Sequence, residues 1–440
     1  MSVAISGIDE STIAQARSGQ RDGFVWPMLP LKLELKSRLP VEEAFMRYQD
    51  LLGLPDQRIA KKPIKPLGAF AAGHGLAYRE IAATGAPFVN SPPEVIGDGD
   101  QRVLHALTRA QYVAQLRKVR LRSRSALIQL PDRVLLDYEL RERSLLDDVI
   151  ELDSAVFRSD GDDAWVFSGD DHGTLRVEEA FTLLGPNTRA FGHWISEYLP
   201  KYIAAVMSGV LPCVPVLIDP GMPPQHRQAL ELLVDAGVRI IEVGTLQTVD
   251  VERLWCAPTI SYCPVLPESN ERYRYDDVAA EPIRFAAAQG EMRRRMLRTI
   301  RPGSDRRIYL ARPGDSHHRR MVNHAEIEAV AAAHGFRKVY PEALSFAEQV
   351  QLLSGARFIV GPEGSALMLA FLADPGARMC VLNHPHTSSV ATVTAPLEPL
   401  GIASTVLTGP FERVDPDYPH FSDYRIDAAA FDRFLGGWCT

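Results

Sequence analysis

The sequence predicts an α/β protein in which two domains with parallel sheets follow a β-rich N-terminal region. From about residue 214 to 244, and again from about 306, short apolar runs alternate with helical patterns, which is typical of βαβ units and therefore of parallel sheets. From 119 to 184, apolar runs are separated by turn residues instead, which predicts consecutive strands. The length of 440 residues is enough for two or three domains.

Bulk composition argues against several classes of protein. An apolar content of 46% and a charged content of 23% are ordinary for a globular enzyme, and a net charge of −7 gives no reason to expect a nucleic-acid partner. The 5 cysteines have no CxxC spacing, which argues against a disulfide framework or a zinc site and favours a reduced, cytoplasmic setting. The N-terminus lacks the apolar core of a signal peptide, and Gly209, Pro212 and Pro215 interrupt the most apolar run, so we expect no membrane span.

The N-terminal region, residues 1–184, carries the fewest local signals. We expect short helices and extended arms up to about residue 115. The stretch "SALIQLPDRVLLDYE" then predicts two strands around a turn at Pro131 and Asp132. The stretch "AWVFSGDDHGTLRVEEAFTLL" predicts another pair of strands around Gly169 to Gly173.

The first α/β domain is predicted over residues 185–290. Its opening stretch, "FGHWISEYLPKYIAAVMSG", has apolar residues at helical spacing, namely Ile195, Leu199, Ile203 and Val206. The runs "VPVLIDP" and "VRIIEVG" are typical of strands, and the helical stretch "PQHRQALELLVDAG" between them has Gly237 as its expected C-terminal stop. Together they predict one βαβ unit.

The second α/β domain is predicted over residues 291–425, and a C-terminal helix over 426–440. The arginine-rich stretch from 291 to 307 is the expected linker between the two α/β domains. The runs "RRIYLAR", "RKVYP", "RFIVG" and "RMCVLN" are typical of strands.

Two helices of this second domain have predicted starts with a specific cap. Asn323 with Glu326, and Ser345 with Glu348, have the spacing of capping boxes. A further short helix is expected to begin at Ser365, after the strand "RFIVG".

The turn "GPEGS", residues 361–365, is the first candidate site. Gly361 ends a predicted strand, and in open α/β sheets ligands bind at the carboxyl ends of strands. The first N–H groups of the following helix carry partial positive charge and can bind a phosphate. Gly364 would let a ligand approach the backbone, and Ser365 could cap the helix or bind the phosphate. The alternative is an ordinary tight turn with Glu363 exposed.

The stretch "GHWISEYLPK" is the second candidate site. His193 and Glu197 are four residues apart and share a helix face with Lys201. A histidine and a carboxylate on one face can act as a base and its orienting partner. They could also bind a metal, although the HExxH pattern is absent. The other alternative is an amphipathic helix in which Trp194 and Tyr198 pack and the polar residues point outward.

A group of arginines forms the third candidate site. Arg312 lies just past a predicted strand end, and it would face the same cleft as Ser365 if both strands belong to one parallel sheet. Arg319 and Arg320 follow it. The guanidinium group binds diphosphates with paired hydrogen bonds. The alternative is a solvated basic loop.

Three segments between about 185 and 385 together resemble glycosyltransferase family 61, in its bacterial branch linked to capsular and other surface polysaccharides. "GHWISEYLPKY" is similar to the family's histidine segment, and "IYLARPG" followed by "RRMVN" is similar to its strand, arginine and Arg-Arg-x-x-Asn segment. "GFRKVYPEALSFAEQVQLLSGARFIVGPEGSAL" is similar to its block with a Pro-Glu pair and a Gly-rich turn. Many members have histidine where this chain has Glu363, alanine at Ser365 and a polar residue at Met368, so the resemblance does not identify the donor.

The resemblance implies a GT-B architecture, in which two Rossmann-like domains face each other across a cleft and the second binds most of the donor. It also implies an inverting transfer that needs no metal and no cofactor. Glu197 is then the expected base for the acceptor hydroxyl, with His193 as its partner or substitute. The residues expected to contact the donor are Arg312, Arg319, Arg320, Asn323, Glu342, Gly361, Glu363, Gly364 and Ser365. Because a carboxylate repels a diphosphate, Glu363 is expected to point away from the phosphates and to bind hydroxyls.

We therefore expect an inverting glycosyltransferase that moves a sugar from a nucleotide sugar to a glycan or glycolipid acceptor in bacterial surface polysaccharide synthesis. We expect a cytoplasmic protein, with peripheral association at the inner face of the membrane left open. Two alternatives stay open. One is a non-catalytic nucleotide- or glycan-binding protein on the same scaffold, suggested by the altered turn. The other is a metal-dependent glycosyltransferase that uses Asp98 and Asp100 of the "DGD" loop.

Overall fold

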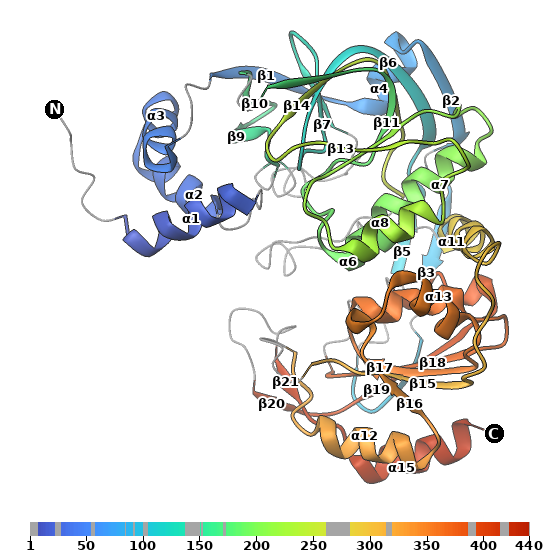
Figure 1. Ribbon diagram of the computed structural model, residues 1–440. Helices are drawn as coiled ribbons and strands as arrows, with labels where there is room; N and C mark the ends of the chain where they lie inside the picture. Colours follow the sequence, from blue (N-terminus) through green and yellow to red (C-terminus); the bar gives the residue numbers. More distant parts are fainter. Residues whose placement is uncertain are drawn as a thin grey trace.

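The computed structural model has two β-sheets on either side of a layer of helices, with a small helical module at one side (Figure 1). We call the part built on the 11-stranded sheet the first unit and the part built on the 6-stranded sheet the second unit. The mixed structure with parallel strands is consistent with the α/β part of the predicted fold class. The structure describes residues 8–22, 28–53, 58–83, 85–90, 93–99, 104–136, 150, 153–169, 173–260, 282–313, 319–385, 393–413 and 422–439.

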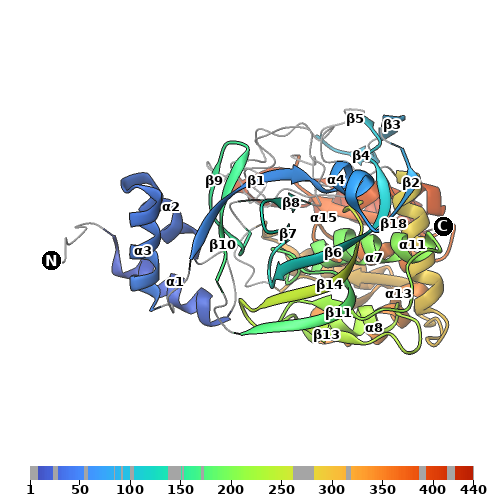
Figure 2. The ribbon, with the colours of Figure 1, turned by 90° about the horizontal axis from the view of Figure 1, so that it is seen from above.

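The helical module consists of α1 (Glu10–Asp22), α2 (Leu29–Arg38) and α3 (Val41–Leu52). Phe45 and Tyr48 of α3 pack on Phe157 of the large sheet, with ring centroids 5.2 and 5.6 Å away. Figure 2 shows the module at one end of the molecule, beside the large sheet. Burial of these aromatic rings is what attaches the module to the first unit.

The large sheet combines a parallel part and an antiparallel part. Its strands, in spatial order, are β13 (Ile240–Glu242), β12 (Val216–Ile218), β11 (Thr174–Thr182), β14 (Thr248–Cys256), β6 (Gln111–Arg122), β7 (Leu127–Gln129), β8 (Val134–Leu136), β1 (Ile59–Pro66), β10 (Asp163–Phe167) and β9 (Val156–Asp160), while β2 (Ala77–Ala82) also pairs with β6. The first four are mutually parallel, and β6 is antiparallel to β14. The predicted βαβ unit is confirmed as β12, α8 (Pro224–Glu231) and β13.

The two predicted strand pairs have different outcomes. The pair around Pro131 and Asp132 is confirmed as the antiparallel hairpin of β7 and β8. The predicted pairing of the two strands around Gly169 to Gly173 with each other is wrong. Strand β10 pairs with β1 and β9, whereas β11 pairs with β12 and β14. Both strands exist, but their partners are distant in sequence and local pattern does not identify them.

The predicted boundary at residue 184 falls inside this sheet. Strand β11, which ends at Thr182, is hydrogen-bonded in parallel to β12 on the other side of the boundary. On its other edge β11 pairs with β14, and β14 pairs with β6. The β-rich region and the first α/β region therefore share one sheet.

The second unit is built on an entirely parallel sheet. Its strands, in order, are β16 (Arg337–Val339), β15 (Arg307–Leu310), β17 (Phe358–Pro362), β18 (Arg378–Asn383), β19 (Ala403–Thr408) and β4 (Glu94–Ile96). Helices α12 (His324–Ala333) and α15 (Ala428–Trp438) cover one face, and α13 (Phe346–Ser354) and the 3₁₀ helix η4 (Ser365–Leu372) cover the other. Strand β4 comes from the N-terminal region, so the chain crosses between the units before residue 100.

The helix layer between the sheets is shared by both units (Figure 1). From the first unit come α6 (Phe191–His193), one π-helical turn η2 (Trp194–Tyr198), α7 (Leu199–Met207) and α8, and α11 (Pro282–Met296) packs between them and η4. One hydrophobic core joins Ile195 and Ile203 to Phe346 and Leu369. Because this core is continuous, the GT-B arrangement of two domains across a cleft stays a prediction.

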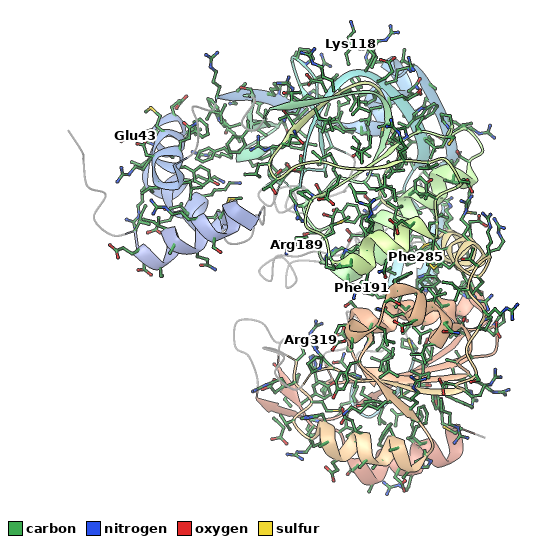
Figure 3. The ribbon with its side chains drawn as sticks, in the orientation of Figure 1. Glu43, Lys118, Arg189, Phe191, Phe285 and Arg319 are labelled. Carbon is green, nitrogen blue, oxygen red and sulfur yellow. The ribbon has the colours of Figure 1, made fainter. Side chains whose placement is uncertain are left out.

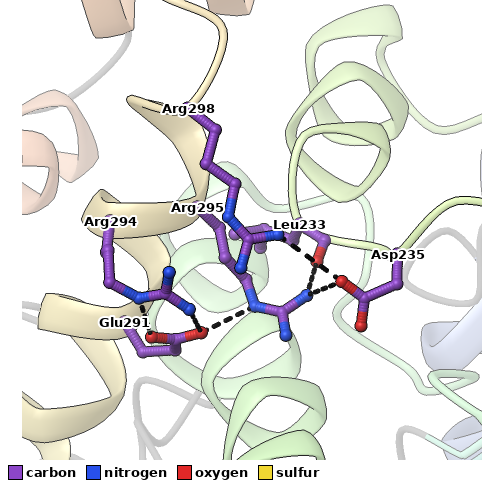
Figure 4. Close-up of polar contacts among 6 residues, drawn as sticks. All are labelled: Leu233, Asp235, Glu291, Arg294, Arg295 and Arg298. Carbon is purple, nitrogen blue, oxygen red and sulfur yellow. Dashed lines mark hydrogen bonds and ion pairs between the residues drawn. The ribbon is translucent and has the colours of Figure 1, made fainter.

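The stretch predicted as a linker, 291–307, begins inside helix α11. Arg295, which is 7% exposed, donates to the Leu233 carbonyl at 2.6 Å and to Asp235 at 2.9 Å, both in the first unit, and to Glu291 at 2.8 Å (Figure 4). A buried guanidinium with three such partners fixes the helix on the first unit. The first part of the predicted linker therefore belongs to a helix that Arg295 attaches to the first unit.

Of the two predicted capping boxes, one forms. Ser345 accepts from the Glu348 N–H and Glu348 binds back to the Ser345 N–H, so this box is confirmed. Asn323 makes no cap of this kind, because its amide binds both backbone groups of Ile426 instead.

The remaining described elements are short or peripheral. They are α4 (Leu67–His74), β3 (Pro87–Asn90), β5 (Leu104–Leu107), η3 (Pro341–Ala343), η5 (Glu398–Leu400), β20 (Phe411–Arg413) and β21 (Asp423–Tyr424). The predicted C-terminal helix is confirmed as α15. Within the described residues, no helix combines the length and the apolar character needed to cross a bilayer.

Candidate functional site

The structure brings the helix that carries His193 against the turn that carries Ser365. A Cβ built on Gly192 would lie 3.3 Å from the Ser365 Cβ and 3.3 Å from the Met368 sulfur. A side chain at position 192 would therefore displace the turn, and glycine permits the close approach. Figure 3 shows Phe191 on the side of the first unit that faces the second, and Arg319 on the facing side of the second unit. The first two candidate sites thus form one region at the junction of the units.

His193 and Glu197 form a pair on one helix face, as their spacing predicts. His193 Nδ1 and Glu197 Oε1 lie 2.9 Å apart, and their side chains are 15% and 1% exposed. Trp194 and Tyr198 are also buried, but so are Glu197 and Lys201, so the alternative with all polar residues pointing outward is wrong. The pair spans a π-helical turn, a feature frequent at functional sites.

The charge of Glu197 sets the titration of His193. Burial by itself would lower the pKa of His193, but the negative charge of Glu197 and the hydrogen bond to it outweigh burial and raise the pKa above its ordinary value. The hydrogen bond occupies Nδ1, which directs proton exchange to Nε2. An imidazole held in this way can accept a proton from a substrate hydroxyl.

The turn at 361–365 differs in detail from its prediction. The helix that follows is 3₁₀, Gly364 precedes it, and Ser365 is exposed and makes no capping hydrogen bond. Gly361 is required by packing, because its Cβ would lie 2.7 Å from the Leu310 carbonyl oxygen of the neighbouring strand. Gly364 faces open space, with nothing closer than 4.0 Å to an added Cβ. A ligand can approach the backbone at Gly364.

Glu363 forms an ion pair with one of the predicted phosphate-binding arginines. Arg319 Nη1 and Glu363 Oε2 lie 2.6 Å apart, and the two side chains are 23% and 11% exposed. The alternative of an ordinary turn with an exposed Glu363 is therefore wrong. Arg319 has a left-handed backbone, with φ of 55°, which is uncommon for a residue other than glycine.

Arg312 lies beside this pair with an unused donor. Its Nη1 is buried and has no hydrogen-bond partner in the described part of the chain, and the same holds for Arg319 Nε. Burial lowers the pKa of Arg312, and the positive charge of Arg319 lowers it further, against the opposing effect of Glu363. Two crowded guanidinium groups with buried unpaired N–H donors provide a strong binding site for an anion.

These arginines open onto a pocket of about 220 Å³ at the carboxyl end of β15. Its lining includes Tyr309, Arg312, Arg319, Arg320, His324 and Glu328. Ligand pockets of roughly 300–1,000 Å³ are common for drug-sized molecules, so this one matches a phosphate group or a diphosphate better than a whole nucleotide sugar.

Two of the predicted donor residues have structural partners, and a third lies outside the pocket. Arg320 binds Asp423 through Nη2 at 2.6 Å and Nε at 3.1 Å, which raises the pKa of Arg320 and occupies one edge of its guanidinium. Asn323 holds the Ile426 backbone at 2.8 and 3.2 Å. Glu342 is exposed on η3 and does not line the pocket. Direct donor contacts by these residues stay predictions.

Two residues of the site region carry no local sequence signal. Asp423 fixes Arg320, and the buried Tyr424 donates to the Leu382 carbonyl at 2.9 Å. Burial raises the pKa of Tyr424, the charge of Glu363 raises it further, and the charge of Arg312 opposes the shift. Both come from β21, about 100 residues after the arginines. Only tertiary structure brings them there.

A metal site is not formed by the part of the chain that the structure describes. No group of three or more His, Cys, Asp or Glu residues could hold an ion there. Asp98 is exposed in a loop after β4, and Asp100 lies outside the described residues. The metal-dependent alternative is thus neither supported nor tested by this geometry.

Comparison with known families agrees with the resemblance seen in the sequence. Residues 191–380 match the model of a family described as Glycosyltransferase 61. This span is less than half of the chain, and it contains the His193–Glu197 pair, the arginine pocket and the turn. The match supports glycosyltransferase family 61 and, with it, a glycosyltransferase as the class of protein. No curated protein matches the chain.

Proposed function

We propose that the protein is an inverting glycosyltransferase that moves a sugar from a nucleotide sugar to a glycan acceptor in bacterial surface polysaccharide synthesis. The observation that carries this proposal is that a candidate acid–base pair and a candidate phosphate-binding turn lie against each other at the junction of the units. An oriented His193–Glu197 pair packs, through Gly192, on the turn at Ser365. The pair supplies acid–base chemistry, and the turn lies beside an anion-binding arginine pocket.

The leaving diphosphate is assigned to the second unit. Arg312 and Arg319 offer buried N–H donors, and the open backbone at Gly364 offers the first N–H groups of η4. Such preorganised donors stabilise the charge that develops on the leaving group. This arrangement makes a metal ion unnecessary for that task.

Glu363 competes with the diphosphate for Arg319. The Glu363 carboxylate binds the Arg319 guanidinium at 2.6 Å. A bound diphosphate would displace it, because two negative groups cannot share the arginine without repulsion. The released Glu363 would then accept hydrogen bonds from donor hydroxyls.

His193 is the better candidate for the base, with Glu197 as its positioning partner. The acceptor hydroxyl must reach the base, and the His193 side chain is 15% exposed while that of Glu197 is 1% exposed. The acceptor oxygen loses its proton to His193 Nε2 as it bonds to the anomeric carbon, while the bond from that carbon to the diphosphate oxygen breaks on the opposite face. Glu197 stabilises the imidazolium that results.

A non-catalytic nucleotide- or glycan-binding protein is the second candidate, and the Arg319–Glu363 pair is the observation that favours it. A carboxylate already bound at the donor arginine reduces the affinity for a diphosphate. Release of nucleoside diphosphate from a panel of nucleotide sugars, with a glycan acceptor present, separates the two candidates. The proposal expects release that persists in EDTA and falls in His193→Ala. No release by the wild type or by His193→Ala would favour the non-catalytic binding protein. Release that EDTA abolishes and manganese restores would favour the metal-dependent enzyme.

A further inference from the structure

A pocket of about 730 Å³ lies on the large sheet, apart from the site described above. Arg176 of β11 and Lys62 of β1 both line it, although these strands are 5 positions apart in the sheet order, so the sheet curls around the pocket. Figure 3 shows Lys118, another lining residue, at the end of the first unit that is remote from Arg319. The volume is in the range of sites that hold small ligands, roughly 300–1,000 Å³.

A row of polar side chains runs across four strands of this pocket. The strand register pairs Arg176 with Asp250, Asp250 with Arg120, and Arg120 with Gln129. Arg120 holds Asp250 through two hydrogen bonds of 2.7 and 3.1 Å. These two charges therefore compensate each other inside the pocket.

The remaining charges leave the pocket positive. Glu178 and Glu252 line the pocket, and each forms an ion pair with an arginine outside it. Glu178 pairs with Arg253 at 2.9 Å, and Glu252 pairs with Arg117 at 3.7 Å. Three lining cations have no ion pair with a carboxylate among the described residues, and these are Lys62, Lys118 and Arg176. Lys62 donates to the Leu130 carbonyl at 2.7 Å, and burial, together with the neighbouring Arg120, lowers its pKa.

Gln129 adds a second, independent sign of a ligand. Its side chain is 3% exposed, it lines the pocket, and its Nε2 has no hydrogen-bond partner within the described chain. A buried amide donor without a partner is unfavourable, and an acceptor atom of a ligand would satisfy it. The pocket therefore has at least one hydrogen-bond donor for which the described part of the protein supplies no acceptor.

We propose that this pocket binds an acidic glycan, an oligosaccharide whose sugars carry carboxylate groups. Carboxylates would pair with Lys118 and Arg176 and accept from Gln129, and sugar hydroxyls would donate to Glu178 and Glu252. The distance of the pocket from Arg319 suits a part of a long chain that lies away from the transfer point. Its role as an acceptor subsite rests on the proposed glycosyltransferase function, whereas the binding itself does not.

Isothermal titration of the full chain with a galacturonate hexasaccharide tests this proposal. Wild-type protein binds it, with an affinity that falls as salt screens the charges. The variant Arg176→Glu loses at least about tenfold in affinity, the scale of a hydrogen bond to a charged group. Lys118→Asn loses affinity as well, and asparagine suits the left-handed backbone of this position, whose φ is 51°. Lys65→Glu, an exposed lysine of β1 outside the pocket, is the matched control and keeps the affinity.

Two further probes decide what kind of ligand is bound. Maltohexaose, which is neutral, binds at least about tenfold more weakly if charged hydrogen bonds carry recognition. Three results would overturn the proposal. They are absence of hexasaccharide binding, equal binding by Arg176→Glu, and competition by pyrophosphate for the same site as strong as that of the hexasaccharide. Nucleoside diphosphate affinity, measured on the same samples, is unchanged in Arg176→Glu. A loss of hexasaccharide binding alone therefore leaves the proposed function intact, and binding without sugar transfer removes only the acceptor role.

Discussion

The two hydrogen-bonded pairs at the candidate site, His193–Glu197 and Arg319–Glu363, are similar in geometry and different in construction. His193 and Glu197 lie 2.9 Å apart and are four residues apart on one helix, so local structure fixes them before any ligand arrives. Arg319 and Glu363 lie 2.6 Å apart and are 44 residues apart, and they join two loops at strand ends. A diphosphate can replace the carboxylate in the second pair, but nothing needs to replace the carboxylate in the first.

This difference separates two roles. Under the proposed function, the first pair stays intact through the reaction, and Glu197 orients His193 and raises its pKa for proton transfer. In the second pair, the proposed donor diphosphate would exchange with Glu363, so the pair would set how strongly the donor must compete for Arg319. Variants of the two pairs should therefore act on different kinetic quantities, the first on turnover and the second on donor affinity.

Removal of the imidazole should have the largest effect. His193→Ala is expected to lower turnover by about 10²–10⁴-fold, the usual contribution of general acid–base catalysis, with little change in donor affinity. Steady-state rates together with calorimetric binding of nucleoside diphosphate measure both quantities. His74→Ala, at an exposed histidine of α4, is the control. Turnover close to that of the wild type in a folded His193→Ala protein would make this helix structural only.

Arg312→Ala should act on the donor instead. Loss of its buried N–H donors is expected to weaken nucleoside diphosphate binding by roughly 1.5–3 kcal/mol, the range for hydrogen bonds to charged groups. Titration calorimetry measures the change, and Arg357→Ala, at an exposed arginine directly before β17, should bind like the wild type. Unchanged affinity in Arg312→Ala would place the diphosphate elsewhere.

Glu363→Gln should have a smaller effect in the opposite direction. The substitution keeps the shape and removes the competing charge, so nucleoside diphosphate affinity is expected to rise by up to about fivefold, equivalent to ~1 kcal/mol, the upper end for a partly exposed ion pair. Glu398→Gln, an exposed glutamate of the second unit, serves as the control in the same titration. A loss of affinity in Glu363→Gln would show that the carboxylate binds the ligand rather than competes with it.

Sequence reasoning reached the features that depend on neighbouring residues. The four-residue spacing of His193 and Glu197, the Ser345–Glu348 capping box and the β12–α8–β13 unit all follow from local periodicity, and the structure contains all three. The arginines near the turn were also expected from their place after a strand end.

Features that depend on distant residues were missed. The Arg319–Glu363 pair, the contact of Asn323 with Ile426 and the addition of β4 to the second sheet join segments between 44 and about 310 residues apart. In the first two cases a side chain with a plausible local role binds a distant residue instead, and in the third a strand pairs with a distant strand. The sequence predicts a linker at Arg295 for the same reason, because its partners Leu233 and Asp235 are about 60 residues away.

The pH dependence of turnover in Glu197→Gln shows whether Glu197 controls His193 as the base. If neutral His193 is the base, wild-type turnover rises with pH through the raised pKa of His193, above the ordinary value near about 6.5. In Glu197→Gln the negative charge is gone while burial remains, so the pKa of His193 falls below its ordinary value. We expect the acid limb to move to lower pH and the maximal rate to drop. An acid limb that stays where it is would contradict the account, because His193 would then titrate independently of Glu197 or take no part in the transfer.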